Sequence, residues 1–162
     1  HSQNFYAEQI LKTLGAHIKS SGTLDAGLEV LHDFMNKLGF PNDEYQIEDG
    51  CGLSKGNKLS PKIITTLLKY MNKHPNGNML WNSLPTSGTD GGLRRRMNSP
   101  QYKNKIHAKT GYIAKTSALS GYIDTSSGDV LVFSILMNNF RNLSSVMKIQ
   151  DDICKILVDC YN

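Results

Sequence analysis

Apolar residues recur with two different periods along the chain. In residues 4–18 and 24–38 an apolar side chain returns every three or four positions, which predicts two amphipathic helices. A third helix is predicted to begin at Pro61, with Ser60 as its N-cap, and to stop at "HPNG", residues 74–77. A short apolar turn, "NMLWNSL", follows it. The first half of the chain is therefore expected to be helical.

The second half has the shorter period of β-strands. Strands are predicted at 105–113 and 117–124, and a longer one, rich in Val, Ile and Leu, at 129–139. The loop "TSSGD" (125–129) would join the last two as a hairpin, and helical spacing returns from Leu143. This order predicts an α+β fold in which helices pack on an antiparallel sheet.

One domain is the simplest organisation for the chain. We expect residues 1–162 to form a single domain, with a helical part at 1–90 and the sheet and closing helix at 100–162. At 39% hydrophobic and 20% charged residues, the composition is that of an ordinary globular protein. No apolar run approaches the roughly 18 residues of a membrane-spanning helix, and no charged, apolar leader opens the sequence.

Charge and cysteine content exclude several function classes. The net charge is +4, and its densest basic cluster, "LRRRM" (93–97), lacks the interleaved aromatics of a nucleic-acid surface, so we read it as a solvated loop. The three cysteines form no C-x-x-C pair and the five histidines are scattered. We therefore expect no metal and no cofactor, and we expect Cys154 and Cys160 to be core residues of the closing helix.

Two short motifs carry candidate chemistry. Lys109-Thr110-Gly111 lies within a predicted strand, where an ammonium, a hydroxyl and an uncovered backbone could bind an anion at a sheet edge. Ser2-x-Asn4 directly precedes the first helix. By itself this second motif is typical of a helix N-cap. The two motifs together match part of the pattern Ser-x-x-Lys, Ser-x-Asn and Lys-Thr-Gly of penicillin-binding proteins.

Nearly the whole chain resembles one family, the D-alanyl-D-alanine carboxypeptidases/endopeptidases of the class C low-molecular-mass penicillin-binding proteins. "HSQNFYAEQILKTLG" resembles the family's Ser-x-Asn segment and helix, and "HAKTGYIAKTSALSGYI" its "KTG…LSGY" strands. "EDGCGLSKGNKLSP" is similar to "DGSGLSRxNxxSP", with Cys51 where serine is usual. "SLPTSGTDGGLRRRM" is similar to "LPxAGxDGTLxxRM", with Ser87 for alanine and Gly92 for threonine. The resemblance implies a β-lactamase/penicillin-binding-protein-like fold.

The resemblance also implies roles in an acyl-enzyme mechanism at a terminal D-Ala-D-Ala amide. Ser2 would pass a proton to the leaving amine, and Asn4 would hold the substrate backbone. Lys109 would attract the terminal carboxylate and tune Ser2, and Thr110 would hydrogen-bond that carboxylate. The backbone beside Gly111 would stay uncovered, and Tyr112 would offer its N–H to the oxyanion. Asp49 and Ser54 would brace the site.

The family's nucleophile lies in a Ser-x-x-Lys motif upstream of Ser-x-Asn. The one match here, "SVMK" (145–148), falls in the predicted closing helix, and we interpret it as a coincidence. We therefore expect this chain to be the C-terminal part of a serine-type D-Ala-D-Ala carboxypeptidase and to be inactive without the nucleophile segment. An exposed sheet edge would then pair with the N-terminal half of the same protein or with a second copy of this chain.

The expected partners follow from the family. They are peptidoglycan stem peptides ending in D-Ala-D-Ala and, for the full-length enzyme, β-lactam antibiotics, in a periplasmic or extracellular location at the cell wall. Nucleic acid is not expected. Two alternatives stay open: a serine β-lactamase-like hydrolase of the same fold, and a non-catalytic peptidoglycan- or anion-binding module using Lys109 and Arg94, Arg95 and Arg96.

Overall fold

The protein forms two compact units that divide between Ile63 and Ile64. The structure is a computed structural model and describes residues 2–160. Each unit has apolar clusters of its own. The expectation of a single domain stays a prediction, because a unit defined by its internal contacts is not thereby shown to fold alone.

The first unit is built on two helices, α1 (Asn4–Lys19) and α2 (Leu24–Lys37), as predicted. They approach each other through glycines: a Cβ atom on Gly15 would lie only 2.7 Å from the backbone nitrogen of Gly27. Thr23 caps α2 by accepting a hydrogen bond from the Ala26 N–H. The backbones of α1 and α2 are therefore in contact at these two positions.

The apolar side chains of α1 are mostly exposed, because α1 meets α2 through backbone at the glycines and not through an apolar face. Leu11 is buried, but Phe5, Ile10 and Ile18 are more than half exposed. The remaining apolar side chains of the unit cluster where the chain leaves α2, around Met35, Phe40, Tyr45 and Ile63. A two-residue bridge between Gln46 and Lys58 then closes the loop that carries Asp49.

Helix α3 (Pro61–Lys73) begins and ends where the sequence predicts. The Ser60 hydroxyl accepts a hydrogen bond from the Ile63 N–H, which is the expected N-cap. The prediction of a short turn after it is wrong, because Gly77–Ser83 forms a seven-residue helix, α4.

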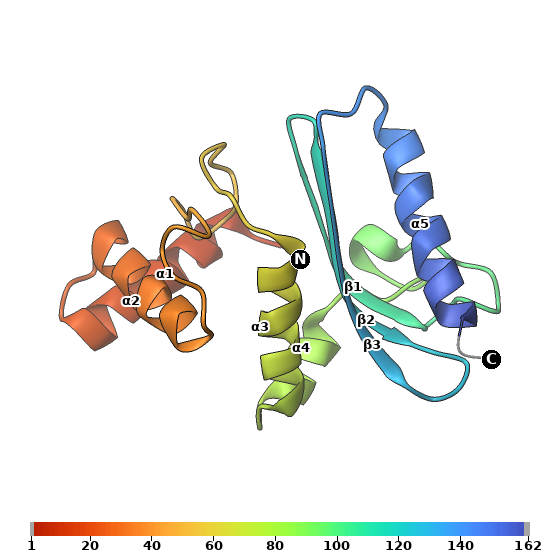
Figure 1. Cartoon of the computed structure of the whole chain (residues 1–162), viewed down its shortest axis with the longest axis horizontal. Coiled ribbons are helices and arrows are strands. Elements are labelled where there is room, and N and C mark those ends of the chain that lie inside the picture. Colours follow the sequence, from red (N-terminus) through yellow and green to blue (C-terminus); the bar gives the residue numbers. More distant parts are fainter. Residues whose placement is uncertain (1, 161–162) are drawn as a thin grey trace. The chain divides into compact units, whose positions relative to one another are not determined.

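The second unit contains an antiparallel sheet in the order β1-β2-β3 (Figure 1). The strands are β1 (Ile106–Ile113), β2 (Thr116–Asp124) and β3 (Val130–Asn138), and residues 125–129 form the predicted hairpin loop. Ala114 and Lys115 alone join β1 to β2, and both have positive φ, 30° and 67°. Two-residue hairpin turns require this conformation, although neither residue type favours it.

Helices cover both faces of the sheet (Figure 1). On one face, Leu119 and Ile123 pack against Cys154 and Val158 of α5 (Leu143–Asp159). On the other face, Tyr122 packs against Leu68 of α3 and against Leu80 and Trp81 of α4. The α+β prediction, with helices packed on an antiparallel sheet, is confirmed.

The cysteines of α5 differ in exposure. Cys154 is fully buried as expected, and burial raises the pKa of its thiol to about 12. Cys160 is exposed, because it is the C-cap residue where the helix leaves the core, so its prediction as a core residue is wrong.

Thiol chemistry tests this arrangement. We expect iodoacetamide at pH 8 to alkylate Cys160 readily and Cys154 only after unfolding, because a buried, protonated thiol does not react. Peptide mass mapping after timed quenching measures both rates. Modification of Cys154 at the rate of Cys160 in native protein would contradict the placement of α5 on the sheet.

Candidate active site

The outer edge of β1 is covered over half its length and open over the other half. Pro85 and Ser87 bond to it at its start: the Ala108 N–H donates to the Pro85 carbonyl (2.9 Å) and the Ser87 N–H to the Ile106 carbonyl (2.9 Å). In the described part of the chain, no backbone hydrogen bond reaches this edge beyond Ala108. The open half contains Lys109, Thr110 and Gly111.

The backbone groups of Thr110 and Tyr112 point outward along this open edge. Neighbouring residues of an antiparallel strand turn their N–H and C=O groups to opposite sides. Since Ala108 bonds outward to Pro85, Thr110 and Tyr112 also face outward, while Lys109 and Gly111 bond to β2. Free outward N–H groups on an edge strand are what an extended peptide or an oxyanion needs.

Lys109 and Thr110 lie on opposite faces of the sheet, as consecutive strand residues must. Lys109 pairs with Ser120, whose hydroxyl is 2.9 Å from that of Ser134, and its exposed ammonium donates to the Thr110 carbonyl. Thr110 is half-buried and its side chain lies against Gly92 of a short 3₁₀ turn, η1 (Gly91–Leu93). The edge thus offers a cation on one face and a hydroxyl on the other.

Ser2 and Asn4 are exposed and make no side-chain hydrogen bond within residues 2–160. The N-cap of α1 is Gln3, whose side chain also makes no capping bond, so the N-cap interpretation of this motif is wrong. Their polar groups are therefore free for another partner.

The loop after the Gln46 bridge is organised by Asp49. Its carboxylate accepts hydrogen bonds from the N–H groups of Gly52 (2.7 Å) and Ser54 (2.6 Å) and from the Asn57 amide (2.8 Å). Partial burial alone would raise the pKa of Asp49, but these hydrogen bonds outweigh it and lower the pKa. The Ser54 hydroxyl donates to Glu48 in the same loop. Both side chains brace the loop; that they support the site stays a prediction.

Glu8 ties this loop to α1, one turn after Asn4. Its Oε1 accepts hydrogen bonds from the N–H groups of Gly50 and Cys51, both at 2.9 Å. The pKa of the Cys51 thiol is raised, first by its hydrogen bond to Glu8 and then by burial. Glu8, Asp49 and Cys51 bring three potential metal ligands within 4.8 Å of one another, but the carboxylates already serve the loop, and we assign no metal.

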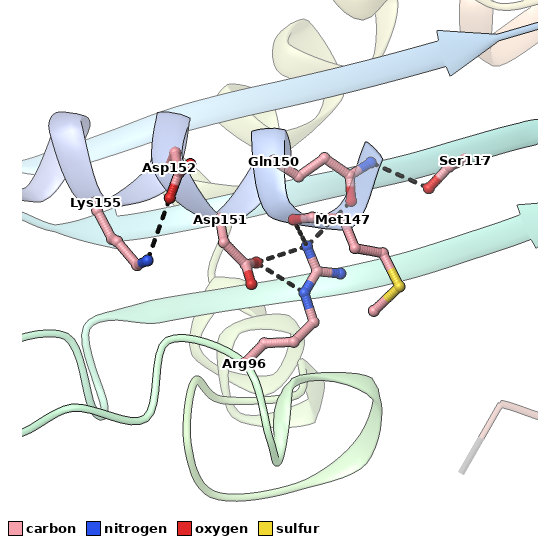
Figure 2. Close-up of polar contacts among 7 residues, drawn as sticks. All are labelled: Arg96, Ser117, Met147, Gln150, Asp151, Asp152 and Lys155. Carbon is pink, nitrogen blue, oxygen red and sulfur yellow. Dashed lines mark hydrogen bonds and ion pairs between the residues drawn. The ribbon is translucent and has the colours of Figure 1, made fainter. Parts of the chain in front are cut away.

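The sequence "LRRRM" is not a uniform basic loop. Arg94 and Arg95 are exposed, but Arg96 is buried and bonded to Asp151 of α5 (Figure 2). This corrects both the solvated-loop interpretation and the three-arginine cluster of the binding-module alternative. No periodicity marks Arg96, because it lies in an irregular segment.

His107 is a second residue that the sequence pattern did not single out. Its ring packs on Trp81, with Nδ1 3.2 Å from the Thr86 hydroxyl and Nε2 3.4 Å from the Asp124 carboxylate. It lies two residues before Lys109 on the same face of β1. Only its contacts, drawn from α4, β2 and the Pro85 segment, reveal that it anchors the start of the strand.

Residues 1–159 match the model of the D-Ala-D-Ala carboxypeptidase 3 (S13) family. The chain belongs to this family. The D-alanyl-D-alanine carboxypeptidase of Actinomadura sp. (strain R39) is 32% identical over 98% of the chain and 30% of its own length. Penicillin-sensitive carboxypeptidase A of Dictyostelium discoideum is 31% identical over 85% of the chain and 28% of its own length. This S13 chain therefore spans about 30% of the length of these curated relatives.

The crystal structure of penicillin-binding protein 4 from Haemophilus influenzae matches 98% of the S13 chain and 37% of its own length, with a TM-score of 0.87 and 21% identity. The same protein has also been solved in complex with a β-lactam. This likeness confirms the predicted penicillin-binding-protein-like fold. In the described residues no helix is long and apolar enough to cross a membrane.

The structure explains one departure of the S13 chain from the family pattern, the serine at position 87. Ser87, which stands where the family usually has alanine, is buried and donates to the Tyr102 carbonyl (2.7 Å) while accepting from the Ile106 N–H (3.1 Å). Its hydroxyl thus ties the start of β1 to the segment before it.

The lowered pKa of Asp49 predicts how the stability of its loop changes with pH. Because the folded pKa lies below the unfolded value of 3.8, the carboxylate stabilises the loop above pH 3.8, and this stabilisation is lost as pH falls through the folded pKa. We expect Asp49→Asn to abolish this acid transition and to lose roughly 1–2 kcal/mol of loop stability at pH 7. Amide exchange at Gly52 and Ser54 measures both effects.

Asp43→Asn is the matched control, because Asp43 is exposed and precedes the same loop. It should leave exchange at Gly52 and Ser54 unchanged. Equal exchange in Asp49→Asn and Asp43→Asn would show that Asp49 does not organise the loop.

Proposed function

We propose that the protein is a serine-type D-Ala-D-Ala carboxypeptidase/endopeptidase acting on peptidoglycan stem peptides through an acyl-enzyme. Membership of the S13 family supports the reaction class. The observation that carries the proposal is the open half of the β1 edge. There the Lys-Thr-Gly motif coincides with outward backbone groups that have no backbone partner in the described residues.

The substrate peptide would lie along this edge as an added strand. Backbone hydrogen bonds from Thr110 and Tyr112 would hold it, because their groups face outward. The Lys109 ammonium and the Thr110 hydroxyl would bind the terminal carboxylate, one from each side of the edge. The uncovered backbone at Gly111 allows close approach, as the exposed glycine pairs only with Ala118 of β2.

The proposed reaction uses only side chains, backbone N–H groups and water. A serine hydroxyl attacks the amide carbonyl and gives its proton to the lysine of its Ser-x-x-Lys motif, from which Ser2 receives a proton. The Tyr112 N–H stabilises the oxyanion of the tetrahedral intermediate. Ser2 passes a proton to the amide nitrogen, the C–N bond breaks and D-alanine leaves, while Asn4 holds the acyl chain. Water then attacks the ester and restores the serine. Ser2 and Asn4 are suited to these roles because both are exposed and neither side chain makes a hydrogen bond within residues 2–160.

The nucleophile would come from a segment outside these 162 residues. The Ser145-x-x-Lys148 match lies in the first turns of α5, where Asn142 caps the helix and both side chains face solvent. Helix α5 covers the sheet face that carries Thr110, not the face of Lys109. Ser145 would therefore lack the lysine and oxyanion groups in the required arrangement.

The N-terminal half of the same protein is the proposed partner that supplies this segment. The outer edge of β3 pairs with no strand in the described part of the chain. On α5, three isoleucines are exposed at helical spacing: Ile149, Ile153 and Ile156. An unpaired strand edge and an apolar helix stripe are surfaces that another part of a fold covers. The location would be periplasmic or extracellular, at the cell wall, where the substrate lies.

Labelled penicillin tests the proposal. We expect no covalent label on the 162-residue chain alone, and labelling when a segment carrying Ser-x-x-Lys is supplied by fusion or as a separate chain. Lys109→Met should then reduce the labelling rate by about a hundredfold or more, because the carboxylate of the penicillin loses its cation.

Ser145→Ala is the control, and it should change nothing. Labelling of the isolated chain that disappears in Ser145→Ala would identify Ser145 as the nucleophile and contradict the mechanism. If the chain binds an acetylated D-Ala-D-Ala peptide without turnover even when the segment is supplied, and Ser2→Ala leaves this binding unchanged, it is a binding module.

A further inference from the structure

Gly92 makes room for the side chain of Thr110. A Cβ atom on Gly92 would lie 3.0 Å from the Thr110 Cγ2, and the Thr110 Oγ1 would be its nearest neighbour, closer still. The hydroxyl of Thr110 is therefore directed toward η1. No real Cβ atom tolerates such contacts, so any larger residue at position 92 must move Thr110 or the turn.

The backbone of Gly92 does not itself require glycine. Its neighbour Gly91 has φ +48° and also lies against Pro85, so both conformation and space select glycine there. Gly92 is outside the left-handed region, and the three atoms nearest to the position of its Cβ all belong to the side chain of Thr110. The side chain of Thr110 is thus the nearest obstacle that a side chain at this position would meet. The S13 chain has glycine where the family pattern usually has threonine.

Two anchors prevent the turn from moving away instead. Leu93 is fully buried against β1 and β2 in the core cluster beneath the sheet. Three residues later, Arg96 is held by α5: its Nε lies 2.8 Å and its Nη2 2.7 Å from the Asp151 carboxylate (Figure 2). The Arg96 carbonyl and the Leu93 carbonyl both accept from the Gly88 N–H at 3.0 Å.

The hydrogen bonds of Arg96 form a network that extends through α5 to β2, at the residue paired with Tyr112. Arg96 Nη2 donates to the Gln150 side-chain oxygen (3.0 Å), and the Gln150 amide donates to the Ser117 hydroxyl (3.1 Å) (Figure 2). Ser117 is paired with Tyr112 across β1 and β2. In the described residues every buried polar side-chain atom has a partner, so the network is complete. A complete buried network of this kind favours one arrangement over others.

We propose that Gly92 is a specificity-determining position: by offering no side chain, it lets η1 hold the Thr110 hydroxyl in the orientation that binds the terminal carboxylate of the substrate. The proposal rests on the carboxylate-binding role proposed above for Thr110. Because Leu93 and Arg96 anchor the segment that follows Gly92, we expect a methyl group at position 92 to be accommodated by rotation of Thr110 about χ1. Threonine has three staggered rotamers available, so this is the softest response.

The rotamer is tested first, on the 162-residue chain and without any substrate. Three-bond scalar couplings in threonine-labelled protein report χ1 of Thr110. We expect Gly92→Ala to change the Thr110 rotamer, while Gly22→Ala, where the nearest atom to the new Cβ would be 3.8 Å away, leaves it unchanged. An unchanged Thr110 rotamer in Gly92→Ala overturns the inference, whatever the protein does.

The specificity is tested with the Ser-x-x-Lys segment supplied, by comparing acylation by a penicillin and by its methyl ester. Thr110→Val should lower the preference for the free acid by about tenfold, and Gly92→Ala by roughly fivefold, with Gly22→Ala unchanged. If Thr110→Val lowers the preference and Gly92→Ala does not, the inference is wrong and the proposed function stands. If Thr110→Val has no effect, the role of Thr110 fails, and the inference about carboxylate specificity fails with it.

Discussion

A β-strand can form backbone hydrogen bonds along both of its edges. One edge of β1 pairs with β2 along its whole length, but the other edge is paired only at its start. The Pro85–Ser87 segment bonds to Ile106 and Ala108 and then turns away, so the outward groups of Thr110 and Tyr112 meet no backbone partner in the described residues. An unpaired edge is a hazard in most proteins because it recruits other strands. Here it lies at the Lys-Thr-Gly motif, where we propose that the peptide substrate adds as a further strand.

Buried contacts on the α5 face of the sheet fix the turn next to this half-open edge. Leu93 is buried under β1, and Arg96 is clamped by Asp151 and Gln150 of α5. A buried ion pair is weak evidence for stability, but its loss leaves an unpaired charge, so it fixes one position of the segment that contains it. The turn that contacts Thr110 is thus held by buried groups: Leu93, Arg96 and Gln150.

The sequence predicts regular elements well where periodicity is long, as in α1, α2, α3, the strands and α5. It fails where the contact is made by backbone. The close approach of α1 and α2 at Gly15 and Gly27 leaves no hydrophobic signature, and the apolar periodicity of α1 does not show that Phe5 and Ile10 are exposed. The motif residues Lys109 and Asp49 could be found by resemblance. Arg96 could not, because its burial depends on Asp151, 55 residues away, and neighbouring arginines suggest a solvated loop.

Amide hydrogen exchange along β1 tests the half-open edge most directly. We expect slow exchange for the N–H groups that bond to β2 or to Pro85, which are those of His107, Ala108, Lys109 and Gly111. We expect fast exchange for the N–H groups of Thr110 and Tyr112. This alternation begins where the Pro85–Ser87 segment ends. Slow exchange at both Thr110 and Tyr112 in the free 162-residue chain would mean that the edge is already paired, and would contradict the proposed substrate-binding strand.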